Sequence, residues 1–116
     1  MAAGQLDLTI EKGATFKKVL YWKDSSKNAV DLTGYIARMQ IRSSIKASSF
    51  LIELTTENGG ITITPLEGKI ELYISDTNTS ALQGNVGVYD MEVIDGSDTV
   101  TKFIRGVVSM TEEVTK

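Results

Sequence analysis

Carboxylates are the main side chains in this 116-residue sequence that could carry out acid–base chemistry, because the chain contains neither histidine nor cysteine. Those two absences exclude a Ser-His-Asp triad, a papain-like dyad, an imidazole-ligated metal and a zinc-thiolate site. A glycosidase would need two carboxylates across a cleft, one of them with a raised pKa. The candidates fall mostly on outward positions of predicted strands, where a solvated face is the simpler interpretation: Glu53, Glu57, Glu71 and Glu92. We therefore expect that the protein is not an enzyme.

Three aspartates, Asp24, Asp31 and Asp90, could in principle supply oxygen ligands to calcium. Calcium needs several converging oxygens, and the sequence has no dense acidic loop that would provide them. Capping of turns by these short polar side chains is therefore the favoured interpretation. We expect no bound metal and no cofactor.

The charge distribution argues against a nucleic-acid partner. Twelve Lys and Arg stand against 15 Asp and Glu, which makes a net charge of −3, and the basic residues are scattered along the chain. A nucleic-acid-binding protein instead concentrates basic side chains in a patch or stripe. Two basic pairs, Lys17 with Lys18 and Arg38 with Arg42, are interpreted as guards of an exposed edge or face against unwanted strand pairing.

The single tryptophan, Trp22, stands at the end of a predicted strand and before a loop. A sugar could stack on its ring, but an amphipathic aromatic residue at a sheet edge is more often used for packing. Tyr73 is predicted to face outward from a later strand. The residues that we single out as a possible interaction surface are Lys17, Lys18, Trp22, Arg38, Arg42 and Tyr73.

A period of two in the apolar residues predicts the elements that position these side chains. In the clearest case, apolar residues at 37, 39 and 41 alternate with polar residues at 38, 40 and 42, and successive side chains on a strand point to opposite faces. The sequence Asn58-Gly59-Gly60 predicts a tight hairpin turn, and one short helical turn is predicted near residues 76–82. The predicted strands cover residues 5–10, 15–22, 35–42, 50–55, 61–64, 69–74, 87–95 and 99–110.

About seven to eight short strands, with no long helix and no proline inside a strand, predict an all-β, antiparallel, immunoglobulin-like β-sandwich. The length suits one domain over residues 1–116, with flexible ends at 1–4 and 111–116. Tyr89 enters a late strand two residues before Met91, which stands where an immunoglobulin domain carries its second cysteine. A tyrosine corner and an ordinary core aromatic are both open interpretations of Tyr89.

The N-terminus has no signal-peptide pattern, and no apolar stretch predicts a membrane span.

The run Val30-Asp31-Leu32-Thr33-Gly34-Tyr35 follows Trp22-Lys23-Asp24 and leads into the strand at 37–42, with Glu53-Leu54-Thr55-Thr56-Glu57-Asn58-Gly59-Gly60-Ile61 after it. These motifs resemble small β-sandwich proteins of tailed bacteriophages. They are similar to the immunoglobulin-like N-terminal domain of phage baseplate upper proteins. The resemblance spans nearly the whole chain, and because its motifs are structural it brings no catalytic residues with it.

The resemblance implies a noncatalytic structural protein of the phage virion, assembled in the host cytoplasm. It would be a tail or baseplate adaptor that connects tail fibres or spikes to the baseplate. The implied partners are other tail, baseplate or fibre proteins and symmetric copies of the chain itself. The charge distribution and the lack of a long apolar stretch, noted above, predict neither a nucleic-acid nor a membrane partner. A long last strand and a free N-terminal strand suit pairing with a neighbour.

In the baseplate upper family, further segments after this domain bind the receptor-binding protein, whereas this chain ends soon after its last strand. This departure from the family counts against direct receptor binding, without deciding whether the chain touches the host receptor. The competing function is a carbohydrate-binding module that recognises host surface polysaccharide, with Trp22, Tyr35 or Tyr73 stacking on sugars. An aromatic content of 7% counts against that alternative.

Overall fold

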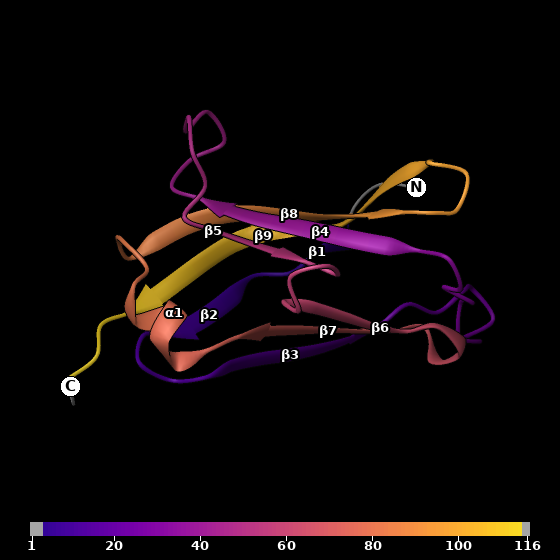
Figure 1. Ribbon diagram of the computed structural model, residues 1–116, viewed down its shortest axis with the longest axis horizontal. Helices are drawn as coiled ribbons and strands as arrows, with labels where there is room; N and C mark the ends of the chain where they lie inside the picture. The colour runs from indigo at the N-terminus through magenta and orange to yellow at the C-terminus, as the bar shows by residue number, and fades with distance from the viewer. Residues whose placement is uncertain (1–3, 115–116) are drawn as a thin grey trace.

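Two β-sheets lie face to face in the computed structural model, which describes residues 4–114 (Figure 1). The larger sheet contains six strands, β1 (Gly4–Gln5), β2 (Leu8–Glu11), β4 (Ile36–Arg42), β5 (Ile52–Thr55), β8 (Val86–Ile94) and β9 (Val100–Thr111). The smaller sheet contains β3 (Phe16–Tyr21), β6 (Ile61–Thr64) and β7 (Lys69–Ile74). A 3-10 helix (Pro65–Glu67) joins β6 to β7, and α1 (Asp76–Ser80) joins β7 to β8.

The core between the sheets follows the predicted alternation. Ala37, Met39 and Ile41 of β4 are buried, as are the apolar residues at 70, 72 and 74 of β7 and at 89, 91 and 93 of β8. Burying one apolar face of each sheet against the other is the main stabilising contribution to a sandwich of this kind. The two-sheet, mostly β architecture is therefore confirmed.

The predicted antiparallel arrangement is wrong at the N-terminus, because the larger sheet is mixed. Its order is β1-β9-β8-β4-β5, and both β1 and β2 pair in parallel with β9. The N-terminal segment is thus paired with β9 on one side and forms an edge of the larger sheet. Apolar alternation specifies which face of a strand is buried, but it does not specify the strand's neighbour or direction.

Tyr89 is a core aromatic whose hydroxyl holds this N-terminal segment. It is 4% exposed and donates a hydrogen bond to the carbonyl oxygen of Leu6, between β1 and β2. A tyrosine corner would bond to backbone a few residues upstream of the tyrosine. That interpretation is therefore wrong, since Leu6 lies 83 residues away.

The predicted hairpin turn at residues 58–60 is also wrong, because β5 and β6 belong to different sheets. The segment instead carries the chain from one sheet to the other. The Asn58 carboxamide oxygen accepts hydrogen bonds from the backbone N–H groups of Thr55, at 2.9 Å, and Gly60, at 2.8 Å. Asn58 therefore stabilises a crossover in which Gly59 has a positive φ of 82°.

The short helical turn is confirmed as α1, with Ser75 as its N-cap accepting a hydrogen bond from the Asn78 N–H at 3.2 Å. The buried Thr79 hydroxyl accepts from the Gly13 N–H and donates to the Ala14 carbonyl oxygen, which ties α1 to the β2–β3 turn. Within residues 4–114, no helix is long and apolar enough to cross a membrane.

Of the residues predicted to form flexible ends, 1–3 and 115–116 lie outside the described residues. Gly4 and Thr111 belong to β1 and β9. Beyond β9, the Lys12 ammonium forms an ion pair with Glu112 at 3.0 Å, and the Lys12 side chain is 8% exposed. The strand pairing and this contact place residues 111–112 against the body of the sandwich.

Candidate functional site

The six residues predicted as an interaction surface do not lie on one surface. Lys17 and Tyr73 are direct partners on β3 and β7, on the outward face of the smaller sheet. Lys18 points to the opposite side, where its partner Leu72 is completely buried. Because β3 is an edge strand of that sheet, a charged side chain on its core side discourages pairing with another strand.

Trp22 is a packing residue in this structure. Its ring lies 5.0 Å from Phe103 and 6.2 Å from Tyr35, measured between centroids, and all three rings pack against the core. Phe103 occupies a β-bulge in β9, between residues that pair with Met91 and Glu92. The aromatic residues considered for sugar stacking thus form no common platform, because Trp22 and Tyr35 pack against the core whereas Tyr73 lies on the outward face of the smaller sheet.

Arg38 and Arg42 lie on the outward face of the larger sheet. Their strand, β4, is hydrogen-bonded to β5 on one side and to β8 on the other. The pair therefore does not guard a sheet edge, and a guarding role on the exposed face stays a prediction. Arg105 of β9 lies on the same face, so all three arginines of the chain are together there.

We call the outward side chains of β4, β5, β8 and β9 the arginine face. Strand registers arrange it in rows that run across the sheet. From one end to the other, the rows are Ile36–Ile94–Val100, Thr55–Arg38–Glu92–Lys102, Glu53–Gln40–Asp90–Arg105 and Arg42–Val88–Val107. Apolar side chains therefore border a charged centre that contains both signs.

Glu92 is at the centre of an ion-pair cluster on this face. Its carboxylate contacts the Arg38 guanidinium and lies 2.6 Å from the Lys102 ammonium, which also reaches Asp90 at 3.4 Å. The hydrogen bond from Lys102, together with the charge and hydrogen bond of Arg38, lowers the pKa of Glu92. The same hydrogen bond raises the pKa of Lys102. Both groups are thus held in their charged forms at neutral pH.

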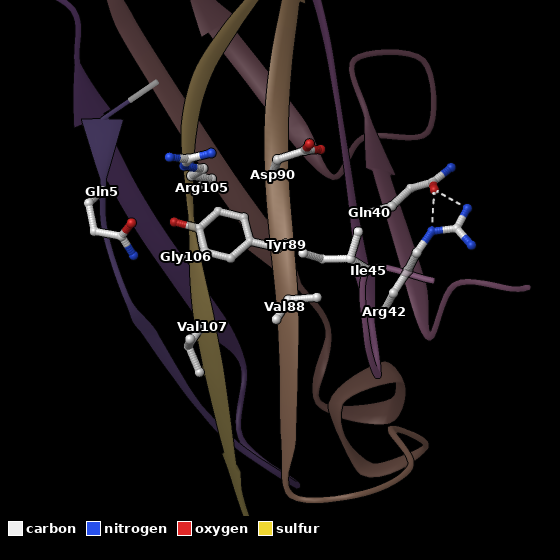
Figure 2. A pocket seen from close by; sticks show the side chains of 10 residues that line it. All are labelled: Gln5, Gln40, Arg42, Ile45, Val88, Tyr89, Asp90, Arg105, Gly106 and Val107. Atoms are coloured by element: carbon white, nitrogen blue, oxygen red, sulfur yellow. Dashed lines mark hydrogen bonds between the residues drawn. The ribbon is translucent and has the colours of Figure 1, made fainter. Parts of the chain in front are cut away.

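A shallow hollow of about 470 Å³ lies beside this cluster (Figure 2). Figure 2 shows Arg105 and Val107 on the β9 side, with Arg42 and Ile45 on the opposite side. Val88 of β8 lies between these two sides.

Two arginines at the hollow differ in their bonding. Arg42 is held in place, since its guanidinium donates to the Gln40 side chain at 2.7 Å and to the Ala47 carbonyl oxygen at 2.8 Å. The Arg105 guanidinium has no ion-pair or hydrogen-bond partner within residues 4–114. Its donors are therefore available to a ligand or partner.

The aspartates considered as calcium ligands have other roles. The carboxylate of Asp24 accepts hydrogen bonds from two N–H groups of its own turn. Asp31 accepts from the hydroxyl and N–H of Thr33, which lowers the pKa of Asp31. The turn-capping prediction is confirmed for both, but it is wrong for Asp90, which lies within β8 and pairs with Lys102. No group of three acidic side chains in the described part of the chain is arranged to hold a metal ion.

No family model matches this chain, and no curated protein matches it. The case for the arginine face as a functional site therefore depends on its geometry alone. No local sequence pattern singles out Arg105, because its closeness to Arg42 depends on the pairing of β8 with both β4 and β9. The sequence did contain a clue to this face. The chain has only three arginines, and each occupies an outward position of a strand.

Proposed function

We propose that this protein is a noncatalytic structural adaptor of a phage tail or baseplate, and that it binds its neighbours through the arginine face. The observation that supports binding is the gathering of all three arginines and several exposed valine and isoleucine side chains on one hydrogen-bonded sheet face. Arginine is enriched in protein–protein interfaces, where its planar guanidinium binds carboxylates through two hydrogen bonds. The placement in a virion rests on the sequence motifs that resemble phage sandwich proteins.

We also propose that the sandwich is immunoglobulin-like. If β3 to β9 are lettered B, C, C′, D, E, F and G in order, the larger sheet contains G-F-C-C′ and the smaller contains B-E-D. These orders match the strands B, E, D and G, F, C, C′ of immunoglobulin domains of the variable type, whose sheets also contain strands A and C″. The strands β1 and β2, which precede the strand lettered B, pair in parallel with β9 and so lie beside the strand lettered G.

Quantitative mass spectrometry of purified phage particles tests the adaptor role, with the tail-tube protein as the internal standard. A copy number near a multiple of three or six supports a position in the baseplate or at a fibre junction. Absence of the chain from intact particles would overturn the proposal.

A titration with host surface polysaccharide tests the competing carbohydrate-binding function. The adaptor proposal expects no change in Trp22 fluorescence, because the ring is already packed against Phe103 and Tyr35. Saturable quenching that Trp22→Phe abolishes would support the carbohydrate-binding module instead.

A further inference from the structure

We infer that the arginine face binds the arginine face of a second copy of this chain. The two copies would be related by a twofold axis that runs parallel to the strands, between β4 and β8. This inference deepens the proposed function by naming a partner for the face, and it rests on that function only in treating the face as an interface.

The charges on the arginine face are complementary under such an axis. The axis places β4 over β8 of the second copy and β5 over β9 of the second copy, and it keeps each row on the matching row. Arg38 then faces Glu92 of the second copy, and Glu53 faces Arg105 of the second copy. Each of these pairs occurs twice, because a twofold interface is isologous.

No two like charges face each other directly in these rows. Lys102 faces Thr55 of the second copy, and Asp90 faces Gln40 of the second copy. Opposed like charges across an interface are unfavourable, so their avoidance in every row favours this particular axis. Arg105 also gains the carboxylate partner that it lacks within residues 4–114 of its own chain.

The apolar ends of the face fit the same axis. Ile36, 45% exposed, lies over Ile94 of the second copy at one end. At the other end, Ile45 is on the β4 side of the hollow and Val107 is on its β9 side, as Figure 2 shows. The axis exchanges these two sides. Ile45, 86% exposed, therefore approaches Val107 of the second copy, which is 42% exposed.

The size of the face sets the expected strength of the dimer. Four strands spaced about 4.8 Å apart and rows repeating every two residues make a face of roughly 500 Å² per copy. A total of about 1,000 Å² is at the lower limit for specific interfaces, so we expect a dissociation constant from roughly micromolar to submillimolar. The measurement must therefore extend to high protein concentration.

Sedimentation velocity over a concentration series tests the inference with a charge exchange. Arg105→Glu places a carboxylate opposite Glu53 of the second copy, and Glu53→Arg places two guanidinium groups opposite each other. We expect each single variant to raise the dissociation constant at least about tenfold. An equimolar mixture of the two variants should dimerise like the wild type, because each altered residue then faces its opposite charge.

Lys17→Glu and Glu71→Arg are matched controls on the outward face of the smaller sheet, and they should leave the dimer unchanged. Thermal melting by circular dichroism establishes that every variant is folded. A wild-type protein that stays monomeric at all concentrations would overturn the inference, as would a mixture that fails to restore dimerisation. A monomer that is present in particles contradicts only this inference, whereas a dimer that is absent from particles contradicts only the adaptor role.

Discussion

The Tyr89 hydroxyl donates its hydrogen bond to the carbonyl oxygen of Leu6, so a buried side chain of β8 holds the N-terminal segment against β9. Two further contacts support this attachment. The Leu6 N–H donates to the carbonyl oxygen of Arg105 at 2.9 Å, and the Asp7 carboxylate accepts from the Val107 N–H at 3.0 Å. The N-terminal strand therefore covers the β9 edge of the arginine face.

We expect Tyr89→Phe to destabilise the protein by about 1–2 kcal/mol, because the Leu6 carbonyl oxygen loses its hydroxyl donor without a change in apolar packing. Urea unfolding with a constant m-value measures the loss. Tyr21→Phe is the matched control, since Tyr21 is 54% exposed on the smaller sheet. Equal effects of the two substitutions would contradict the role assigned to the Tyr89 hydroxyl.

Tyr89 also predicts a loss of stability at alkaline pH. Burial, with a contribution from the negative charge of Asp7, raises the pKa of Tyr89 to about 12. A folded-state pKa above the unfolded value of about 10 gives stabilisation that is complete below pH 10 and is lost as the pH rises towards 12. Urea unfolding from pH 9 to 12 should therefore show a steeper decline for the wild type than for Tyr89→Phe. Parallel declines would exclude this contribution.

Gly106→Ala should loosen the N-terminal strand. A Cβ atom at Gly106 would lie 2.2 Å from the Leu6 carbonyl oxygen, so the backbone of one strand must move. We expect a destabilisation of about 1–3 kcal/mol, by analogy with overpacked sites, and faster amide exchange in β1. Gly96→Ala is the control, because a Cβ atom there meets nothing within 4 Å. Unchanged exchange in β1 would contradict the close approach.

Lys18 and Leu72 give a matched test of the core. They are paired on the core side of β3 and β7, yet Leu72 is 0% exposed and Lys18 reaches solvent at the sheet edge. Leu72→Asp should unfold the domain by burying an unpaired charge, whereas Lys18→Asp should remain folded. Circular dichroism melting distinguishes them. A wild-type melting temperature for Leu72→Asp would mean that the burial pattern of β7 is wrong.

Met39→Asp in β4 should behave like Leu72→Asp, since Met39 is 1% exposed.

Glu92 should contribute to the loss of stability in acid. Its pKa is lowered in the folded protein by Lys102 and Arg38, so its stabilisation is present above the unfolded pKa of about 4.3 and is lost as the pH falls below that value. Between pH 7 and pH 3, the wild type should lose more stability than Glu92→Gln in urea unfolding. Glu67→Gln, on the exposed 3-10 helix, is the control. A decline that Glu92→Gln leaves unchanged would contradict the prediction.

Features that depend on neighbouring residues were predictable. The alternation in β4 and β7, the short helical turn of α1 and the capping by Asp24 and Asp31 all follow from side-chain chemistry within a few positions. The segment 58–60 shows where prediction from neighbouring residues fails. Asn58-Gly59-Gly60 has the residues of a tight hairpin turn. However, β5 belongs to the larger sheet and β6 pairs with β7 in the smaller one, so the two strands bury their apolar sides against the core from opposite sheets.

The sequence by itself determined the fold class, a sandwich of short strands, and the buried side of most of those strands. The reason is that a period of two in the apolar residues is a local property of the chain. Only the tertiary structure decided which strands are neighbours. The parallel position of β1 and β2, and the meeting of Arg38, Arg42 and Arg105 on one face, depend on pairings between residues far apart in sequence. Those pairings are selected by the packing of the whole core, and no single strand contains the information that specifies them.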